Sequence, residues 1–470
     1  MRANGIDIAG WGEMLVARLE SAGLPLHSFA AGDGERIVLE RYWLPCGPEL
    51  AQSTHSVTKS FTSMAVGLAI GSGALTRKTR VGELLQPRGG LETRLAEATV
   101  ADLLTMRSGH GRSIGGDVLR LCKDSWLAVC VAPEMVYRPG EHFVYSSGTS
   151  HLLSAMVQSA TGRTVFDLLD ASVFQPMGYE NHSWQRDPEG ITAGGNGLNL
   201  RLRDLWKWGQ LCLLDGRFRG ETLLPENWVA EATRPAVAFD TLEEDGVSIG
   251  YGDHVWCGPR GAYFASGIFG QNCIVVPDLD LVVAFTAGLT RGDHLRLLRL
   301  LFDSLPRPEG RRNRNAMADT PKCALAPLPP ALPWRGNLPP KGCWSCSDNP
   351  MGISRISMSR RSDKLIVALH DENGEHAVTS GVAHWHAGRT NLPFWFLHHS
   401  YQPDDIQVVA TASRNGGEEI RLEWSFPETP FRDTVHLTLD GEGGFLWTHR
   451  TNVNSSATEY SMSCRPLPTK

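Results

Sequence analysis

The pattern of apolar and polar positions separates a mixed first part of the chain from a strand-rich last part. Apolar residues recur at helical spacing in three segments, residues 1–24, 57–70 and 150–160. Short β-like runs lie between them, at residues 36–40 and in a hairpin over residues 273–287. Mixed elements with a late block of strands predict an α/β (α+β) domain in which helices flank an antiparallel sheet.

The residue composition of the chain changes over residues 304–341. Nine prolines fall in this stretch, which therefore cannot continue a helix or a central strand and is interpreted as a linker. The sequence thus predicts three parts: a first domain over residues 1–305, a proline-rich linker over 306–341, and a last domain over 342–470.

After the linker the pattern is almost wholly β. Runs of β-formers are separated by turns rich in Asp, Asn and Gly, as in the segments 365–374, 406–426 and 434–448. We expect an antiparallel up-and-down sheet or a small, lipocalin-like barrel. Its many aromatic residues favour partial packing of this domain on its neighbour. By analogy alone with other proteins that carry such a barrel, we expect it to narrow access to a site on the first domain without supplying a catalytic group.

Composition and net charge argue against several classes of function. The chain has 470 residues, 41% hydrophobic and 20% charged, as in globular proteins with a sizeable core. A net charge of -6 and the lack of a long basic run argue against nucleic-acid binding. The first residues carry neither a signal-peptide core nor an apolar span, so we expect a cytoplasmic protein without membrane contact, compatible with a homo-oligomer.

The ten cysteines are scattered along the chain, and without an export signal we expect reduced thiols. Cys343 and Cys346 form the one CxxC pattern, but the neighbouring sequence supplies no second pair of ligands at zinc-site spacing. We therefore expect no metal site.

Candidate chemistry begins with Ser56 and Lys59. They open the helical segment 57–70, so the lysine projects one turn after the serine on the same face. A serine hydroxyl must lose its proton to attack a carbonyl, and an amine with a depressed pKa can accept that proton. The neighbouring His55 points to a different face and is interpreted as structural or solvent-facing.

Two later segments of the chain contain groups that could act together with Ser56 and Lys59. Tyr145 lies on a loop directly before the helical segment 150–160, where its phenol can reach a Ser/Lys pair. Residues 263–271 contain small residues next to the strand 274–277. A strand edge of this kind lets a substrate backbone approach and donates an N–H to an oxyanion hole.

In this order, the three segments resemble the SxxK, YxN and Lys-Thr-Gly elements of serine β-lactamases, D,D-peptidases and related esterases. Three other runs, residues 99–109, 194–205 and 266–271, are similar to that family's DLLTHTSG, GGxGLxLTxRDLxKFG and xGxGGQ segments. The resemblance covers residues 35–303 and implies a β-lactamase-like fold.

The resemblance also implies roles for individual residues. Ser56 would be acylated, Lys59 would be its proton partner, and Tyr145 would shuttle protons between nucleophile and leaving group. Backbone N–H groups of Ser56 and of a residue near Ser266 would form the oxyanion hole, and Ser147, Ser266 and Gly267 would be the substrate-binding residues. No metal or organic cofactor is implied.

Two departures from the family pattern bear on the substrate. Ser147 stands at the third position of YxN, and the third element lacks a Lys or His. Arg260 is close in sequence and could replace that cation, although a turn arginine is the simpler interpretation. Without the cation, neutral esters and amides should be better substrates than β-lactams that carry a carboxylate.

Three functions remain open at this point. The first is hydrolysis of a small ester, amide or peptide through an acyl-enzyme on Ser56. The second is acyl transfer to an amine or alcohol, as in a transesterase or peptide cyclase, from the same intermediate. The third is a non-catalytic binding or scaffold module, which the joint presence of Ser56, Lys59 and Tyr145 disfavours.

Overall fold

The chain folds into two compact units. The computed structural model describes residues 6–239, 247–306, 322–337, 339–392, 396–401 and 403–468. The first unit consists of residues 1–42, 47–287 and 291–325, and the second of residues 43–46, 288–290 and 326–470. Residues 307–321 and 338 of the predicted linker lie outside the described residues, and its described part contains the short strands β14 and β15.

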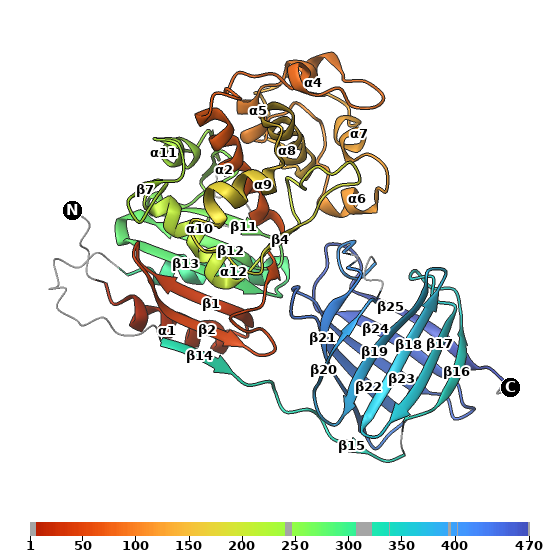
Figure 1. Ribbon diagram of the computed structural model, residues 1–470. Helices are drawn as coiled ribbons and strands as arrows, with labels where there is room; N and C mark the ends of the chain where they lie inside the picture. Colours follow the sequence, from red (N-terminus) through yellow and green to blue (C-terminus); the bar gives the residue numbers. More distant parts are fainter. Residues whose placement is uncertain are drawn as a thin grey trace. The chain divides into compact units, whose positions relative to one another are not determined.

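The first unit contains a nine-stranded sheet (Figure 1). In spatial order its strands are β14 (Lys322–Ala326), β2 (Ile37–Trp43), β1 (Leu26–Gly32), β13 (Leu281–Ala287), β12 (Gln271–Val276), β11 (Tyr263–Gly267), β10 (Trp256–Cys257), β9 (Gly250–Tyr251) and β8 (Val237–Ala238). Two small sheets accompany it, β3 (Gln52–Ser53) with β5 (Leu198–Leu200) and β4 (Ser183–Trp184), and β6 (Arg217–Phe218) with β7 (Glu221–Thr222). The predicted hairpin over residues 273–287 is present as β12 and β13, which pair antiparallel.

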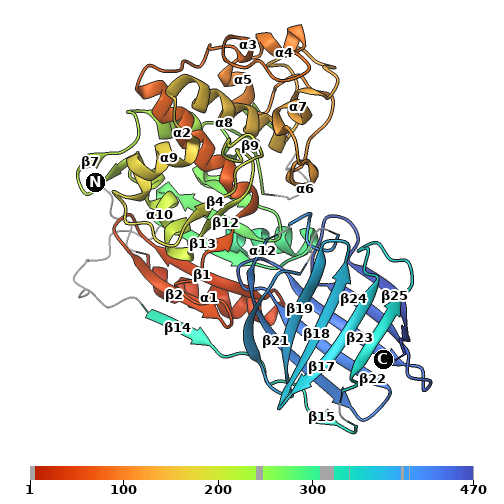
Figure 2. The ribbon, with the colours of Figure 1, turned by 45° about the vertical axis from the view of Figure 1, so that its right-hand side comes forward.

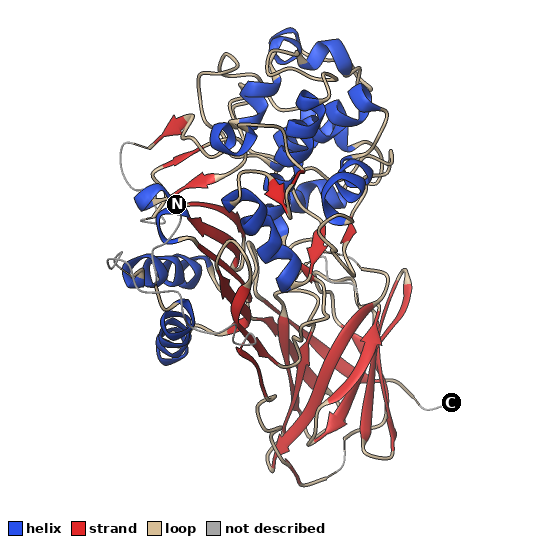
Figure 3. Ribbon diagram, turned by 60° about the vertical axis from the view of Figure 1, so that its left-hand side comes forward, coloured by secondary structure: helices blue, strands red, loops and turns tan. Residues whose placement is uncertain are grey.

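The helices of the first unit cover both faces of this sheet (Figure 3). They are α1 (Ile8–Ser21), α2 (Thr58–Gly71), α3 (Val81–Leu84), α4 (Thr93–Glu97), α5 (Val100–Leu104), α6 (Gly116–Leu121), α7 (Trp126–Val131), α8 (Ser147–Thr161), α9 (Val165–Leu169), α10 (Leu202–Leu213), α11 (Trp228–Ala232) and α12 (Arg291–Ser304). The three helical segments expected from periodicity are α1, α2 and α8.

Alternation along the strands assigns each helix to a face. A Cβ on Gly12 of α1 would meet Leu39 and Phe29, whereas a Cβ on Gly209 of α10 would meet Val282 and Cys273. Because neighbouring strand residues point to opposite faces, α1 packs on one side of the sheet and α10 on the other. The indole N–H of Trp11 donates to the carbonyl of Ser304, which holds α12 beside α1.

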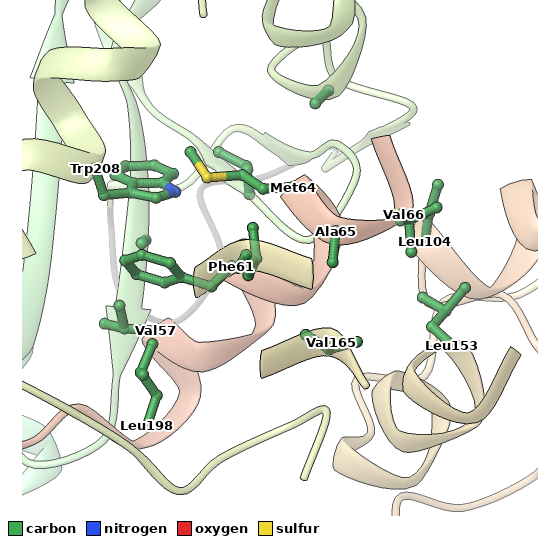
Figure 4. Packing of buried hydrophobic residues seen from close by; sticks show 14 of the residues in the cluster. Val57, Phe61, Met64, Ala65, Val66, Leu104, Leu153, Val165, Leu198 and Trp208 are labelled. Carbon is green, nitrogen blue, oxygen red and sulfur yellow. The ribbon is translucent and has the colours of Figure 1, made fainter. Parts of the chain in front are cut away.

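Helix α2 lies in the centre of the first unit and is buried on nearly all sides. Its apolar residues Phe61 and Met64 lie beside Trp208 of α10 in Figure 4. A helix that is buried all round is fixed by tertiary packing rather than by its own propensity. The polar residues at its start are therefore held in a rigid frame.

The second unit contains strands and no helix among its described residues (Figure 2). Nine strands close into a ring in the order β21 (Ile406–Asn415), β19 (Gly374–Val382), β18 (Lys364–Asp371), β17 (Arg355–Arg361), β16 (Gly342–Cys346), β25 (Glu459–Pro466), β24 (Phe445–Thr451), β23 (Arg432–Leu439) and β22 (Glu419–Ser425). The strands β15 (Trp334–Arg335) and β20 (His386–Thr390) pair with β21 beside the ring.

The prediction of a small β-barrel is thus confirmed, with one departure from up-and-down order. Strands β19 and β21 run parallel, because β20 intervenes between them in the chain; β20 pairs antiparallel with residues 406–410 of β21, next to residues 411–412, which pair with β19. In the part of the chain that the structure describes, no helix is both long and apolar enough to cross a bilayer.

Candidate active site

Ser56 lies in a tight turn, residues His55–Val57, directly before α2. The backbone of His55 adopts a left-handed conformation, with φ of 49°. Thr54 anchors the turn, because its backbone N–H and its hydroxyl both donate to the carbonyl of Leu198, at 3.0 and 2.7 Å. The hydroxyl of Ser56 is therefore half-buried at the head of the helix rather than within it.

Lys59 is fully buried one turn further on, with 1% of its surface exposed. Its Nζ lies 3.0 Å from Ser56 Oγ, 3.0 Å from Ser147 Oγ and 2.8 Å from the carbonyl oxygen of Gly195. All three partners are neutral. The structure thus brings together Ser56, Lys59 and Ser147, which the sequence places in two separate segments.

Burial and, as the smaller cause, the positive charge of Arg120 on α6 together lower the pKa of Lys59 to about 7. Removing an ammonium group from water disfavours its charged form, and none of the neutral partners restores it. The amine of Lys59 is consequently present in both protonation states near neutral pH, as a proton acceptor for a serine must be.

Tyr145 precedes α8 and is half-buried. Its ring lies 4.8 Å from Lys59 Nζ and packs on Trp256 and Tyr251, at centroid distances of 5.5 and 6.0 Å. Burial raises the pKa of Tyr145 to about 12, although a hydrogen bond with Ser56 acts in the opposite direction. The resting state therefore holds a phenol rather than a phenolate.

The glycine pair before Asn196 explains how Gly195 reaches Lys59. A Cβ on Gly194 would lie 2.1 Å from the carbonyl oxygen of Ser150, and one on Gly195 would lie 2.7 Å from Cβ of Ser147. Only glycine lets this loop lie against α8, where the backbone carbonyl can accept from the amine. The role of Gly195 was not predicted from the sequence.

Strand β11 lies against the turn that carries Ser56. A Cβ on Gly267 would lie 2.3 Å from the carbonyl oxygen of Thr54 and 3.1 Å from the backbone nitrogen of Ser56. Strand β10 pairs with β11 only at Tyr263 and Phe264, so the edge beyond Phe264 has no strand partner among the described residues. Gly267 thus faces the nucleophile turn.

Ser266 lies on the other face of β11. It pairs with Asn272, which is hydrogen bonded to His294 of α12 at 2.6 Å. By alternation its side chain points toward the α12 face, so only its backbone lies along the strand edge near Ser56.

Arg260 and Arg120 differ in their surroundings. Arg260 is exposed, and its guanidinium donates to the carbonyl of Pro306 at 3.2 Å. Arg120 is buried, and its charge acts on Lys59. The positive charge near the Lys59 amine thus comes from Arg120 on α6. This role could not be predicted from the sequence, because an arginine on a short helix belongs to no motif.

Asn196 is a second polar residue that the sequence analysis did not select. It is 4% exposed, and neither its amide oxygen nor its amide nitrogen has a hydrogen-bond partner among the described residues. It follows Gly195 directly and packs against Gly116, the first residue of α6. A two-ended amide therefore lies beside the loop that holds Lys59, while position 147 carries a serine.

Comparison with known proteins assigns the chain to a family. The family described as Beta-lactamase matches residues 13–303 of the chain. The chain belongs to the beta-lactamase family. The matched region contains Ser56, Lys59, Tyr145, Gly195 and Gly267. No curated protein matches the chain significantly.

Solved structures with this beta-lactamase-like fold include a protein named as a 6-aminohexanoate-dimer hydrolase from Bacillus anthracis. It is 19% identical with a TM-score of 0.54, over 62% of this chain and 80% of that one. EstCE1, described as a hydrolase with promiscuous acyltransferase activity, is 14% identical with a TM-score of 0.52, over 63% and 97% of the two chains. A structure of SurE with D-Leu is 18% identical with a TM-score of 0.50, and the match covers 89% of this chain and 97% of that one. At these identities the likeness concerns the fold.

Proposed function

We propose that this beta-lactamase-family protein is a serine hydrolase that cleaves a small ester, amide or peptide through an acyl-enzyme on Ser56. The observation that carries the proposal is the hydrogen bonding of Lys59. A neutral amine has two N–H groups and one lone pair. In the structure Lys59 Nζ donates to the oxygens of Gly195, Ser147 and Ser56. Once neutral, the amine can keep its two N–H groups on Gly195 and Ser147, and its lone pair would then face the hydroxyl proton of Ser56.

Acylation would begin when Lys59 takes the proton of Ser56 and the serine oxygen attacks the substrate carbonyl. The developing oxyanion would be held by the backbone N–H of Ser56 and a backbone N–H on the edge of β11. The phenol of Tyr145 would protonate the leaving group and regain its proton from the ammonium of Lys59. Attack by water on the acyl-enzyme, with the proton transfers reversed, would release the acid and restore Ser56.

Acyl transfer remains the second candidate, because an amine or alcohol could replace water in the last step. The neighbour EstCE1 is described as a hydrolase with promiscuous acyltransferase activity, which favours testing this reaction. Both reactions share the acyl-enzyme, so they differ only in the acceptor.

The test is covalent labelling of the full chain with a fluorophosphonate, read by intact mass, together with turnover of p-nitrophenyl esters, amino-acid amides and nitrocefin with and without an amine acceptor. Ser56→Ala should abolish labelling and turnover at a stability cost of about 1 kcal/mol, the scale of one lost side-chain hydrogen bond. Ser63→Ala is the matched control, because it removes a buried hydroxyl of the same helix that has no hydrogen-bond partner in the described structure.

Tyr145→Phe should lower kcat by about 10²-fold or more, the scale of a positioned acid–base group, while labelling at Ser56 persists more slowly. A Ser56→Ala protein that keeps esterase activity would refute the nucleophile assignment. Substrate loss without free acid, seen only with an amine present, would favour acyl transfer.

A further inference from the structure

The barrel of the second unit closes at two cysteines. Strands β16 and β25, the first and last of the ring in sequence order, pair antiparallel, with Cys346 directly opposite Cys464. The two Sγ atoms lie 3.8 Å apart, although 118 positions separate the residues in the chain. Directly opposed residues of antiparallel strands have Cα separations of about 4.5–5.5 Å, within the range that a disulfide spans.

The two thiols differ in access. Cys464 is 2% exposed, and Cys346 is half-buried. In β16 the side chains of Trp344 and Cys346 share one face, and Cys343 lies on the other face and is exposed. The CxxC pattern therefore does not bring its own two cysteines together, because residues three apart in a strand point to opposite faces.

We propose that Cys346 and Cys464 are a thiol–disulfide exchange site that covalently joins the first and last strands of the barrel when the protein meets a small disulfide such as oxidised glutathione. Both residues are thiols in the structure described here. The sulfurs must approach by about 1.7 Å to reach the bonding distance of about 2.05 Å, which side-chain rotation can supply.

The exchange proceeds in two balanced steps. The thiolate of Cys346 attacks one sulfur of oxidised glutathione, which forms a mixed disulfide and expels one glutathione thiolate. Cys464 then loses its proton and attacks the Cys346 sulfur, forming the protein disulfide and expelling the second glutathione. The two protein thiols are oxidised, and one glutathione disulfide is reduced to two thiols.

The exposure of the two cysteines and the pKa of Cys346 decide which thiol reacts first. A hydrogen bond from Cys464 lowers the pKa of Cys346 against the opposing effect of burial, so Cys346 is the better initial nucleophile. Cys464 is too enclosed to meet glutathione first, but its Sγ lies 3.8 Å from that of Cys346, close enough to resolve the mixed disulfide.

The bond would close a long loop in the unfolded chain. Cross-linking residues 118 positions apart restricts the unfolded ensemble much more than the folded barrel. The oxidised protein should therefore melt roughly 5 °C or more above the reduced protein in the transition that reports the barrel.

The test incubates the native full chain with oxidised glutathione, blocks free thiols with iodoacetamide and maps disulfide-linked peptides by mass spectrometry. We expect a peptide pair joining Cys346 to Cys464 and the higher melting temperature. Cys346→Ser should remove both effects, whereas Cys343→Ser, on the exposed face of the same strand, should leave both intact. Cys464→Ala should trap one glutathionyl group on Cys346, because the resolving thiol is gone.

Alkylation of both Cys346 and Cys464 after oxidation of the wild-type protein would overturn the proposal, as would a link from Cys346 to Cys343. The wild-type peptide map decides the matter even if the buried substitution at Cys464 prevents folding. A crosslink without any change in melting temperature would overturn the stabilising role.

Discussion

Lys59 carries most of the chemistry at the scale of single residues. Its amine is buried, its three hydrogen-bond partners are neutral, and the nearby charge of Arg120 is of the same sign. Burial and the like charge favour the uncharged amine, and the neutral partners supply no negative charge that would oppose them. The motif supplied the residue, but its basicity near neutral pH is a property of the surroundings.

The first prediction is a pH dependence. With a pKa of about 7 for Lys59, the reactive neutral amine is lost as pH falls below that value. The rate of Ser56 labelling and kcat/KM should therefore rise with pH through about 7 and level off above it. The check is a pH profile of labelling with an uncharged probe.

Arg120→Gln provides the comparison for this profile. Removing the neighbouring positive charge should move the midpoint to higher pH, by less than the whole shift because burial is the larger cause. An unchanged midpoint in a folded variant would show that Arg120 does not act on the amine, and a rate that falls with rising pH would contradict a neutral Lys59 as the base.

At the scale of elements, the site depends on the close approach of strand β11 to the turn before α2. Gly267 is the point of contact, since even one methyl group there would collide with the carbonyl of Thr54. The sequence indicated a small-residue strand edge at this place. It could not indicate which residue faces Ser56, because that depends on the register of the strand.

The second prediction follows from this contact. Gly267→Val should push β11 away from the turn and displace the oxyanion donors, lowering kcat by about 10²-fold or more, the scale of one lost donor. Gly292→Ala, on α12 with open space around its Cα, should leave activity unchanged. The measurement is kcat for an aryl ester, with melting temperature as the check on folding; a normal kcat for Gly267→Val would remove β11 from the oxyanion hole.

At the scale of the whole molecule, every proposed active-site residue lies in the first unit. Ser56, Lys59, Tyr145, Ser147 and Gly267 all fall within residues 47–287. The barrel has its own core, with buried residues such as Trp424 and Trp447. We therefore expect the second unit to contribute no catalytic group.

The third prediction tests this division of labour. A truncated chain ending at residue 325 retains the long segments of the first unit and should still react with a fluorophosphonate at Ser56. Its substrate range is the second readout, since loss of a gating domain would broaden it. If the truncated chain folds, as circular dichroism would report, and yet does not label, the second unit completes the active site.

The sequence by itself determined several of the main elements. Local pattern located α1, α2, α8 and the β12–β13 hairpin, turn signals located β18, β21, β22, β23 and β24 of the barrel, and the motif order placed Ser56, Lys59 and Tyr145. These features depend on neighbours a few residues apart, so local pattern is sufficient to predict them.

Only the tertiary structure decided which distant groups meet. Lys59 contacts Ser147 and Gly195 across 88 and 136 positions, and Cys346 meets Cys464 across 118. The burial that lowers the pKa of Lys59, the register that turns Gly267 toward Ser56, and the closure of the barrel are likewise products of packing. Such contacts depend on how whole elements pack, and residue spacing within one segment does not encode that arrangement.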